Sequence, residues 1–207
     1  MKPVNMTYQE ATTVPVGGCE ALDFIRKGNI QDGDKVLING AGGTIGTFAV
    51  QLAKYYGAQV TGVDSQDKLD MLHSIGADHV IDYTRGDFTK NSQAYDFILD
   101  LVSKGSFSGC IRSLNQNGRY LIANPDPSQI IRGWWTSKIS AKKVIFGGAS
   151  PNRKDLIYLK ELIEDGRVRV IIDRSYPLER AAEAHRYVET GRKKGHVVIT
   201  VNHDDKT

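Results

Sequence analysis

The chain has 207 residues, with 27 Lys and Arg against 24 Asp and Glu for a formal net charge of +3, which gives no reason to invoke binding to nucleic acid. The sequence has no apolar run of the roughly 18 residues that a membrane helix needs, and its first residues lack the apolar stretch of a signal peptide. The length suits one large domain, or one domain with part of another.

The first 33 residues are predicted to form a helical lead-in. Thr7-Tyr8-Gln9-Glu10 has the pattern of a capping box and predicts a short helix, which we expect Pro15 to end. A helical pattern follows over residues 17–27, and Asp32-Gly33 predicts a turn.

The next stretch contains the parts of a dinucleotide-binding βαβ unit in the required order. Residues 36–38 are apolar, residues 39–46 are Asn-Gly-Ala-Gly-Gly-Thr-Ile-Gly, and residues 47–56 follow a helical pattern. A second apolar run over residues 59–63 ends on Asp64. A strand, a glycine turn, a helix, a second strand and an acid in this order are typical of dinucleotide binding.

The glycine turn has the features of an anion site. We expect Gly40 and Gly43 to adopt backbone angles closed to other residues and to let a pyrophosphate lie against the main chain. The N–H groups of Thr44 and Ile45 open the predicted helix without intrahelical partners, and the helix dipole adds to their attraction for an anion. Because Gly46 has no Cβ, the helix can lie close to the first strand.

The spacing of the turn is Gly-x-x-Gly-x-x-Gly, and Ala41 stands where the pattern Gly-x-Gly-x-x-Gly has its first glycine. The alternative interpretation is a glycine-rich loop without a ligand. The preceding strand, the following helix and an acid 18 residues beyond Gly46 favour dinucleotide binding.

Asp64 is the predicted selector of the cofactor. At the end of the second strand, a carboxylate accepts hydrogen bonds from the adenosine ribose and repels a 2′-phosphate, whereas the alternative is a solvated loop acid. Ser65 and Lys68 could reach a phosphate, so NAD is favoured over NADP by a small margin. The predicted cofactor-binding residues are Gly40, Gly42, Gly43, Thr44, Ile45, Gly46, Asp64, Ser65, Lys68, Val102 and Asn124.

Helices and apolar strands alternate beyond Asp64. Helices are predicted over residues 66–74, with a C-cap at Gly76, and over residues 107–114. Strands are predicted over residues 79–83, 95–101, 119–123 and 142–146, and a turn is predicted at Asn117-Gly118. We therefore predict an α/β fold, a doubly wound Rossmann sheet of six parallel strands in the order 3-2-1-4-5-6 with helices on both faces. Its ligand-binding carboxyl ends lie at or near Asn39, Asp64, Val102, Asn124 and Gly147.

The tail beyond this sheet predicts two helices and two strands, over residues 155–165, 168–176, 178–190 and 195–201. These elements are too few for a domain of their own. The predicted division is therefore a lead-in over residues 1–33, a Rossmann core over 34–150 and a C-terminal segment over 151–207.

The sequence resembles the medium-chain dehydrogenase/reductase superfamily, and most of all its zinc-independent quinone-oxidoreductase branch. The resemblance is carried by residues 14–18 (Val-Pro-Val-Gly-Gly), 34–53 with the glycine turn, 74–83 and 195–199. It implies that a GroES-like catalytic barrel is missing from this chain. It also implies that the strands around Val170 and Val198 are a remnant of that second domain.

The resemblance also bears on zinc. Zinc-bearing relatives carry a four-cysteine lobe, whereas this sequence has only Cys19 and Cys110, which are expected to be free thiols in a reducing cytoplasm. The position of a ligand cysteine in those relatives corresponds to Val16, so Cys19 is out of register. We therefore predict no metal site and a cytoplasmic location.

Several other side chains have two interpretations. Glu20 stands where relatives often have a threonine near the nicotinamide. One interpretation is that it orients a substrate or a proton relay, and the other is that it is a solvated acid in the first turn of a helix, where the dipole favours it. His73, His79, His185, His196 and His203 show no metal spacing, and for His196 a solvated surface is favoured over a place near the cofactor. Trp134-Trp135 lies in a predicted irregular stretch, where it lines the substrate pocket, covers a partner surface or packs on its own domain.

The predicted function is hydride transfer from NAD(P)H to a quinone, enone or carbonyl acceptor without zinc, with the catalytic residues unknown. The alternatives are a non-catalytic nucleotide-binding module and the cofactor domain of an alcohol dehydrogenase. By resemblance, the strand over residues 142–146 is a sheet edge that joins two copies near Val144 into a homodimer. No nucleic-acid or membrane partner is expected.

Overall fold

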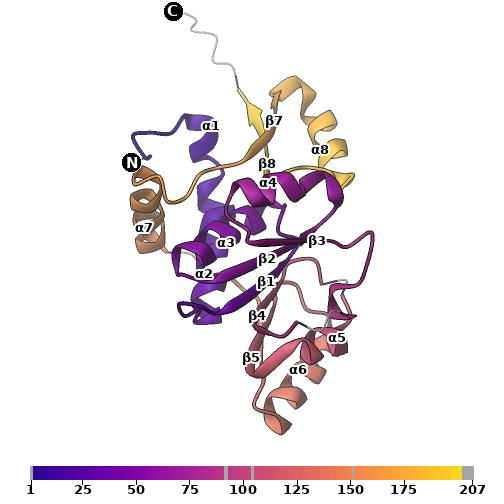
Figure 1. Ribbon diagram of the computed structural model, residues 1–207. Helices are drawn as coiled ribbons and strands as arrows, with labels where there is room; N and C mark the ends of the chain where they lie inside the picture. The colour runs from indigo at the N-terminus through magenta and orange to yellow at the C-terminus, as the bar shows by residue number, and fades with distance from the viewer. Residues whose placement is uncertain (1, 91–92, 104, 151, 202–207) are drawn as a thin grey trace, which may run out of the picture.

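Figure 1 shows the protein as a computed structural model, which describes residues 2–90, 93–103, 105–150 and 152–201. Its centre is a six-stranded parallel sheet in the order β3-β2-β1-β4-β5-β6, which confirms the predicted topology. The strands are β1 Lys35–Asn39, β2 Gln59–Asp64, β3 His79–Asp82, β4 Tyr95–Asp100, β5 Leu114–Ile122 and β6 Lys143–Phe146.

Both faces of the sheet are covered, as the continuous apolar strands predict. Successive side chains of a strand point to opposite faces. In β1, Val36 and Ile38 enter one hydrophobic cluster while Leu37 enters the other, and all three are fully buried. From Val36 to Asn39 the central strand is therefore interior, which holds the glycine turn that follows it in a fixed place.

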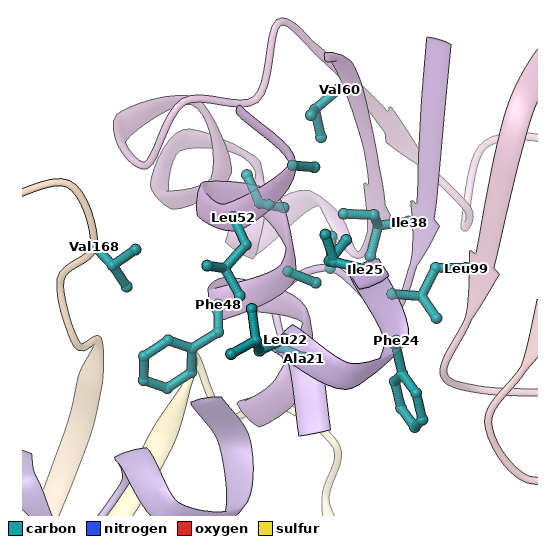
Figure 2. Packing of buried hydrophobic residues seen from close by; sticks show 14 of the residues in the cluster. Ala21, Leu22, Phe24, Ile25, Ile38, Phe48, Leu52, Val60, Leu99 and Val168 are labelled. Carbon is teal, nitrogen blue, oxygen red and sulfur yellow. The ribbon is translucent and has the colours of Figure 1, made fainter. Parts of the chain in front are cut away.

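One face is covered by α2 (Cys19–Gly28), α3 (Thr44–Tyr55), α4 (Leu69–Ser74) and α7 (Arg153–Glu164), which all contribute to the larger cluster. Figure 2 shows Leu22 of α2 and Leu52 of α3 packed in this cluster together with Ile38 and Leu99 of the sheet. On the other face lie α5 (Phe107–Arg112) and the 3₁₀ turn η3 (Phe88–Lys90).

The lead-in contains the predicted capping box, because the Thr7 side chain accepts the Glu10 N–H and α1 spans Tyr8–Ala11. The next helix begins earlier than expected, with a π-helical turn, η1 Val14–Gly18, that runs directly into α2. Pro15 lies in the first turn of η1, where a missing N–H costs no hydrogen bond. It therefore starts this helix as well as separating it from α1.

Two predictions about the second half of the sheet are wrong. The stretch around Trp134 is helical: α6 spans Pro127–Ile139, with Pro127 in its first turn and a reciprocal Asp126–Gln129 capping box. The predicted turn at Asn117-Gly118 lies inside β5, where the register against β4 shifts from Tyr95–Leu114 to Phe97–Arg119. The extra residues form an irregularity in the strand, so the chain does not have to leave it.

The C-terminal segment packs against the Rossmann core. Leu159 of α7 and Val168 belong to the larger cluster, and Arg26 of α2 forms an ion pair with Asp155. Beyond them, β7 (Ile172–Pro177) and β8 (His196–Thr200) form a separate parallel pair, joined by the turn η4 (Leu178–Arg180) and α8 (Ala181–Glu189). In Figure 1 this pair and α8 lie at the end of the molecule away from α6.

In the part of the chain that the structure describes, no helix combines the length and the apolar character needed to cross a bilayer.

Candidate functional site

A cleft of about 750 Å³ opens at the carboxyl ends of the central strands. Its walls come from the turn after β1, from the ends of β2 and β4, and from the C-terminal segment near Lys193. Of the residues predicted to bind a cofactor, the following line this cleft: Gly40, Gly43, Thr44, Ile45, Gly46, Asp64, Lys68 and Val102.

The glycines of the turn have different tasks. Gly40 has a φ of +85°, and a Cβ there would lie 2.7 Å from Val102 Cγ2, so this position requires glycine. A Cβ on Gly46 would lie 2.3 Å from the Gly40 carbonyl oxygen, so the first turn of α3 packs directly on the glycine turn. Gly43 has ordinary extended angles, φ −86° and ψ −177°, so the prediction that it needs special backbone angles is wrong.

Gly43 is the N-cap of α3, so the helix presents its first N–H groups, beginning with those of Thr44 and Ile45, at the wall of the cleft. These groups have no intrahelical acceptor, and the helix dipole places partial positive charge beside them. The geometry is that of an anion site.

Asp64 is buried and is already engaged. Its Oδ2 accepts the Gly42 N–H at 2.8 Å, and its Oδ1 accepts the Ser65 N–H at 2.9 Å. Lys68 Nζ lies 2.9 Å from Oδ1, and both side chains of this pair are less than a tenth exposed. The interpretation of Asp64 as a solvated loop acid is therefore wrong, because its carboxylate fixes the glycine turn and its charge is neutralised by Lys68.

Lys193 is a wall residue that sequence analysis missed. Its Nζ donates to Thr44 Oγ1 at 2.7 Å and to the Gly195 carbonyl at 2.8 Å. Burial, together with the charge of nearby Lys68, lowers the pKa of Lys193. The contact joins residues 149 positions apart, so no local pattern in the sequence could reveal it.

The other wall of the cleft is fixed by a buried carboxylate. Asp100, at the end of β4, accepts hydrogen bonds from Asn39 Nδ2 at 3.0 Å, from Tyr120 Oη at 2.9 Å and from the N–H groups of Val102 and Ser103. Burial raises the pKa of Tyr120, and the Asp100 charge adds to this effect, so the phenol stays a donor. This network joins the ends of β1 and β4 to Tyr120 of β5 and sets the position of Val102.

Three predicted cofactor residues do not line the cleft. Gly42 uses its N–H for Asp64 and its carbonyl for the Gly195 N–H. Ser65 Oγ donates to Asp67, and Asn124 is exposed beyond β5. Gly42 and Ser65 support the site through the backbone, whereas Asn124 makes no hydrogen bond to the other described residues of the site.

The remaining candidates are not among the residues that line the cleft. Glu20 is in the first turn of α2, and Trp134 and Trp135 are more than half exposed on α6. His196 is buried, its Nδ1 lies 3.2 Å from the Ile171 carbonyl, and its ring packs edge-on against Phe48, so the prediction of a solvated surface is wrong for it.

Cys19 and Cys110 are buried free thiols, as expected, and His203 lies outside the described residues. Over residues 2–90, 93–103, 105–150 and 152–201, no three His, Cys, Asp or Glu side chains converge as metal ligands.

Comparisons with known proteins agree with this architecture. A family model described as zinc-binding dehydrogenase matches residues 75–199. The mitochondrial NAD(P)H oxidoreductase RTN4IP1 of Bos taurus is 30% identical, over 97% of this chain and 57% of the relative. The 2-methylene-furan-3-one reductase of Solanum lycopersicum is 30% identical, over 96% of this chain and 48% of the relative.

Two solved structures extend the comparison. The quinone oxidoreductase from Coxiella burnetii superposes with a TM-score of 0.89 at 27% identity, covering 98% of this chain and 63% of the other. An NAD-dependent alcohol dehydrogenase gives a TM-score of 0.82 at 25% identity, covering 97% of this chain and 61% of the other. The chain thus spans roughly half to three fifths of the length of these curated relatives and structures.

Proposed function

This chain belongs to the zinc-binding dehydrogenase family within the medium-chain dehydrogenase/reductase superfamily, and we propose that it is the NAD(P)H-binding part of an oxidoreductase. The observation that carries this proposal is the cleft itself, in which a glycine turn, the N-terminus of α3 and the end of β2 meet at the carboxyl edge of the sheet. This is where doubly wound sheets bind dinucleotides.

The residues present fit a nicotinamide dinucleotide. The N–H groups of Thr44 and Ile45 would hold the pyrophosphate, and Asp64 Oδ2 has a further lone pair for an adenosine ribose hydroxyl. The network around Asp100 would hold Val102 as a wall for the rest of the cofactor. The cofactor, when bound, supplies the hydride, while these residues bind it, orient it and exclude water.

We propose a quinone, an enone or another carbonyl compound as the hydride acceptor. Support comes from the names of the relatives, which include a 2-methylene-furan-3-one reductase and a quinone oxidoreductase. A zinc ion does not fit the described residues, because no three of their His, Cys, Asp or Glu side chains gather as a ligand set. Val16 stands where zinc-bearing relatives have a ligand cysteine, and on this ground transfer without zinc belongs to the proposal.

A preference for NAD is also part of the proposal, in a weaker form than the sequence suggests. Lys68 neutralises Asp64, so the repulsion of a 2′-phosphate is reduced. We expect NADH to bind more tightly than NADPH by less than about tenfold, because a paired charge has a much smaller field than a free one.

The test is a calorimetric titration of the chain with NADH and NADPH, followed by an assay of their oxidation by a quinone or an enone. We expect binding but turnover far below the order of 10 per second, because the part of the relatives that this chain does not cover would complete the site. A competent turnover would show that this chain suffices. Absence of binding would contradict the proposal, and binding without turnover in any longer form of the protein would favour the non-catalytic module.

We also propose that two copies assemble through α6 and the edge strand β6. Gln129 and Gly133 are the buried residues of α6, and its apolar side chains face outward. The side chain of Ile131 is 70% exposed and that of Ile139 is 68% exposed. A helix with its apolar face outward indicates a covered surface, and α6 lies beside the sheet edge, because its Gly133 packs against Val144 and Phe146 of β6. One edge donor is already engaged, because the Val144 N–H donates to Ser137 Oγ, so the α6 face would supply most of the contact.

Light scattering tests this assembly. We expect a dimer for the wild-type chain and for Ile157→Glu, a matched control because Ile157 is an exposed isoleucine on α7. Ile131→Glu should give a monomer. A wild-type monomer at high concentration, or a dimer in Ile131→Glu, would contradict the proposal.

The predicted cytoplasmic location likewise remains a prediction, and the name of the bovine relative places that protein in mitochondria.

A further inference from the structure

The cleft contains a cation whose charge is not matched by a carboxylate. Lys193 Nζ donates to two neutral oxygens, Thr44 Oγ1 and the Gly195 carbonyl. Among the ion pairs formed within the described residues, none includes Lys193. Lys68, the other lysine of the cleft, differs because it is paired with Asp64.

The backbone holds Lys193 in this place. The Gly195 N–H donates to the Gly42 carbonyl at 2.8 Å, and Thr44 Oγ1 donates to the Gly195 carbonyl at 3.1 Å. On the other side, Lys68 Nζ donates to the Gly191 carbonyl at 3.0 Å. The segment over residues 191–195 is thus tied at both ends to the glycine turn and its acid, and Lys193 projects between these ties.

A half-buried ammonium without a counter-ion favours an anion beside it. Removing a charge from water costs free energy that an opposite charge offsets. Two of the three ammonium hydrogens have acceptors, which leaves one for a ligand. The anion site at the start of α3 is adjacent, since Thr44 is both the first residue of α3 and the partner of Lys193.

We propose that Lys193 binds the pyrophosphate of the cofactor, opposite the N–H groups that open α3. This inference rests on the proposed function and adds a residue from the C-terminal segment to the cofactor site. The pyrophosphate is favoured over a 2′-phosphate because Lys193 contacts Thr44 at the start of α3, whereas the adenosine ribose belongs at the end of β2, beside Asp64.

The experiment compares the wild-type chain with Lys193→Met, which keeps the length of the side chain and removes its charge. Lys194→Met is the matched control, because the Lys194 side chain lines a separate polar pocket with Asp67 and Asp173. The probes in calorimetric titrations are NADH, NADPH, ADP, inorganic pyrophosphate and adenosine.

Lys193→Met should weaken the binding of NADH, NADPH, ADP and inorganic pyrophosphate alike, on the order of 10-fold, because each ligand loses one charge-assisted hydrogen bond. Adenosine should bind as it does to the wild type, and Lys193→Arg should recover most of the lost affinity. The salt dependence of pyrophosphate binding should be shallower in Lys193→Met, whereas Lys194→Met should match the wild type.

Three outcomes would overturn the inference. Unchanged affinities in Lys193→Met would show that the ammonium does not touch the ligand. A loss for NADPH alone would assign Lys193 to the 2′-phosphate, and an equal loss for adenosine would assign it a purely structural role. A wild-type chain that binds no dinucleotide would refute the proposed function, and the inorganic pyrophosphate titrations would then decide the role of Lys193.

Discussion

Gly43 and Gly46, the two glycines at the start of α3, should differ strongly in how much an added methyl group changes the stability of the fold. In Gly46→Ala, the new Cβ would lie 2.3 Å from the Gly40 carbonyl oxygen and 2.5 Å from the Ala41 carbonyl oxygen. Both obstacles are backbone atoms of a tight turn, so they cannot rotate away. In Gly43→Ala, the nearest atom is the Gly40 carbonyl oxygen at 3.4 Å, and the backbone angles suit any residue.

The magnitudes follow from these contacts. Overpacking against fixed backbone costs about 3 kcal/mol, and replacing glycine by alanine in a helix returns about 1 kcal/mol, so Gly46→Ala should lose about 2 kcal/mol of stability. Gly43→Ala gives up a favourable N-cap residue but restricts the unfolded chain, and these terms of about 0.5 kcal/mol nearly cancel.

Urea unfolding followed by circular dichroism measures both variants. The midpoint should fall for Gly46→Ala and stay near the wild-type value for Gly43→Ala, with equal slopes. If Gly46→Ala were as stable as Gly43→Ala, α3 would not pack on the glycine turn as described.

Three further predictions concern buried polar groups. Burial lowers the pKa of His196 from 6.5 to about 4. As the pH falls from 6.5 to about 4, the unfolded chain therefore binds a proton that the folded chain does not. The free energy of unfolding, which is fully present above pH 6.5, should fall by on the order of 3 kcal/mol over this range. In His196→Gln the midpoint of urea unfolding should depend less on pH over this range. The same pH dependence in the wild type and in His196→Gln would refute the argument. Asp64→Ser should lower or invert the ratio of NADH affinity to NADPH affinity, measured by calorimetry. It should also destabilise the fold by about 3 kcal/mol, because Lys68 loses its buried partner. An unchanged affinity ratio would show that Asp64 does not select the cofactor. Tyr120→Phe should cost about 1–2 kcal/mol in urea unfolding by removing a donor to Asp100, and a fully stable variant would show that the network does not need this hydrogen bond.

The unit from β1 to β2 could be predicted because its signals are local. The glycines of the turn lie within a few residues of each other, between an apolar strand and an amphipathic helix, and Asp64 follows at the end of the next strand. Each of these positions depends on backbone geometry that neighbouring residues determine. The sheet order then follows from the alternation of strands and helices.

The helix α6 shows how local signals can be misjudged. Its capping box at Asp126 and Gln129 and its Pro127 were present in the sequence. The glycine and proline content of this stretch nevertheless suggests an irregular structure. The apolar residues of this helix face outward, so its pattern did not have the usual relation to the core.

Lys193 and His196 could not be placed from the sequence. Both follow the last helix in a stretch that looks polar and solvated. Their environments come from contacts with Thr44, Phe48 and Ile171, and two of these residues lie in α3, far back along the chain. Contacts of this kind depend on how the C-terminal segment packs, which no local pattern records.

Cofactor binding at the glycine turn is the central claim, and a calorimetric titration of the wild-type chain and Gly43→Asp with NADH and NADPH tests it most directly. Gly43→Ala serves as the control, because it adds a side chain without charge. The wild type and Gly43→Ala should bind one dinucleotide per chain, and Gly43→Asp should not bind, since its carboxylate would take the place of the pyrophosphate at the start of α3. Equal affinities in the wild type and Gly43→Asp, or no binding by the wild type, would contradict the claim.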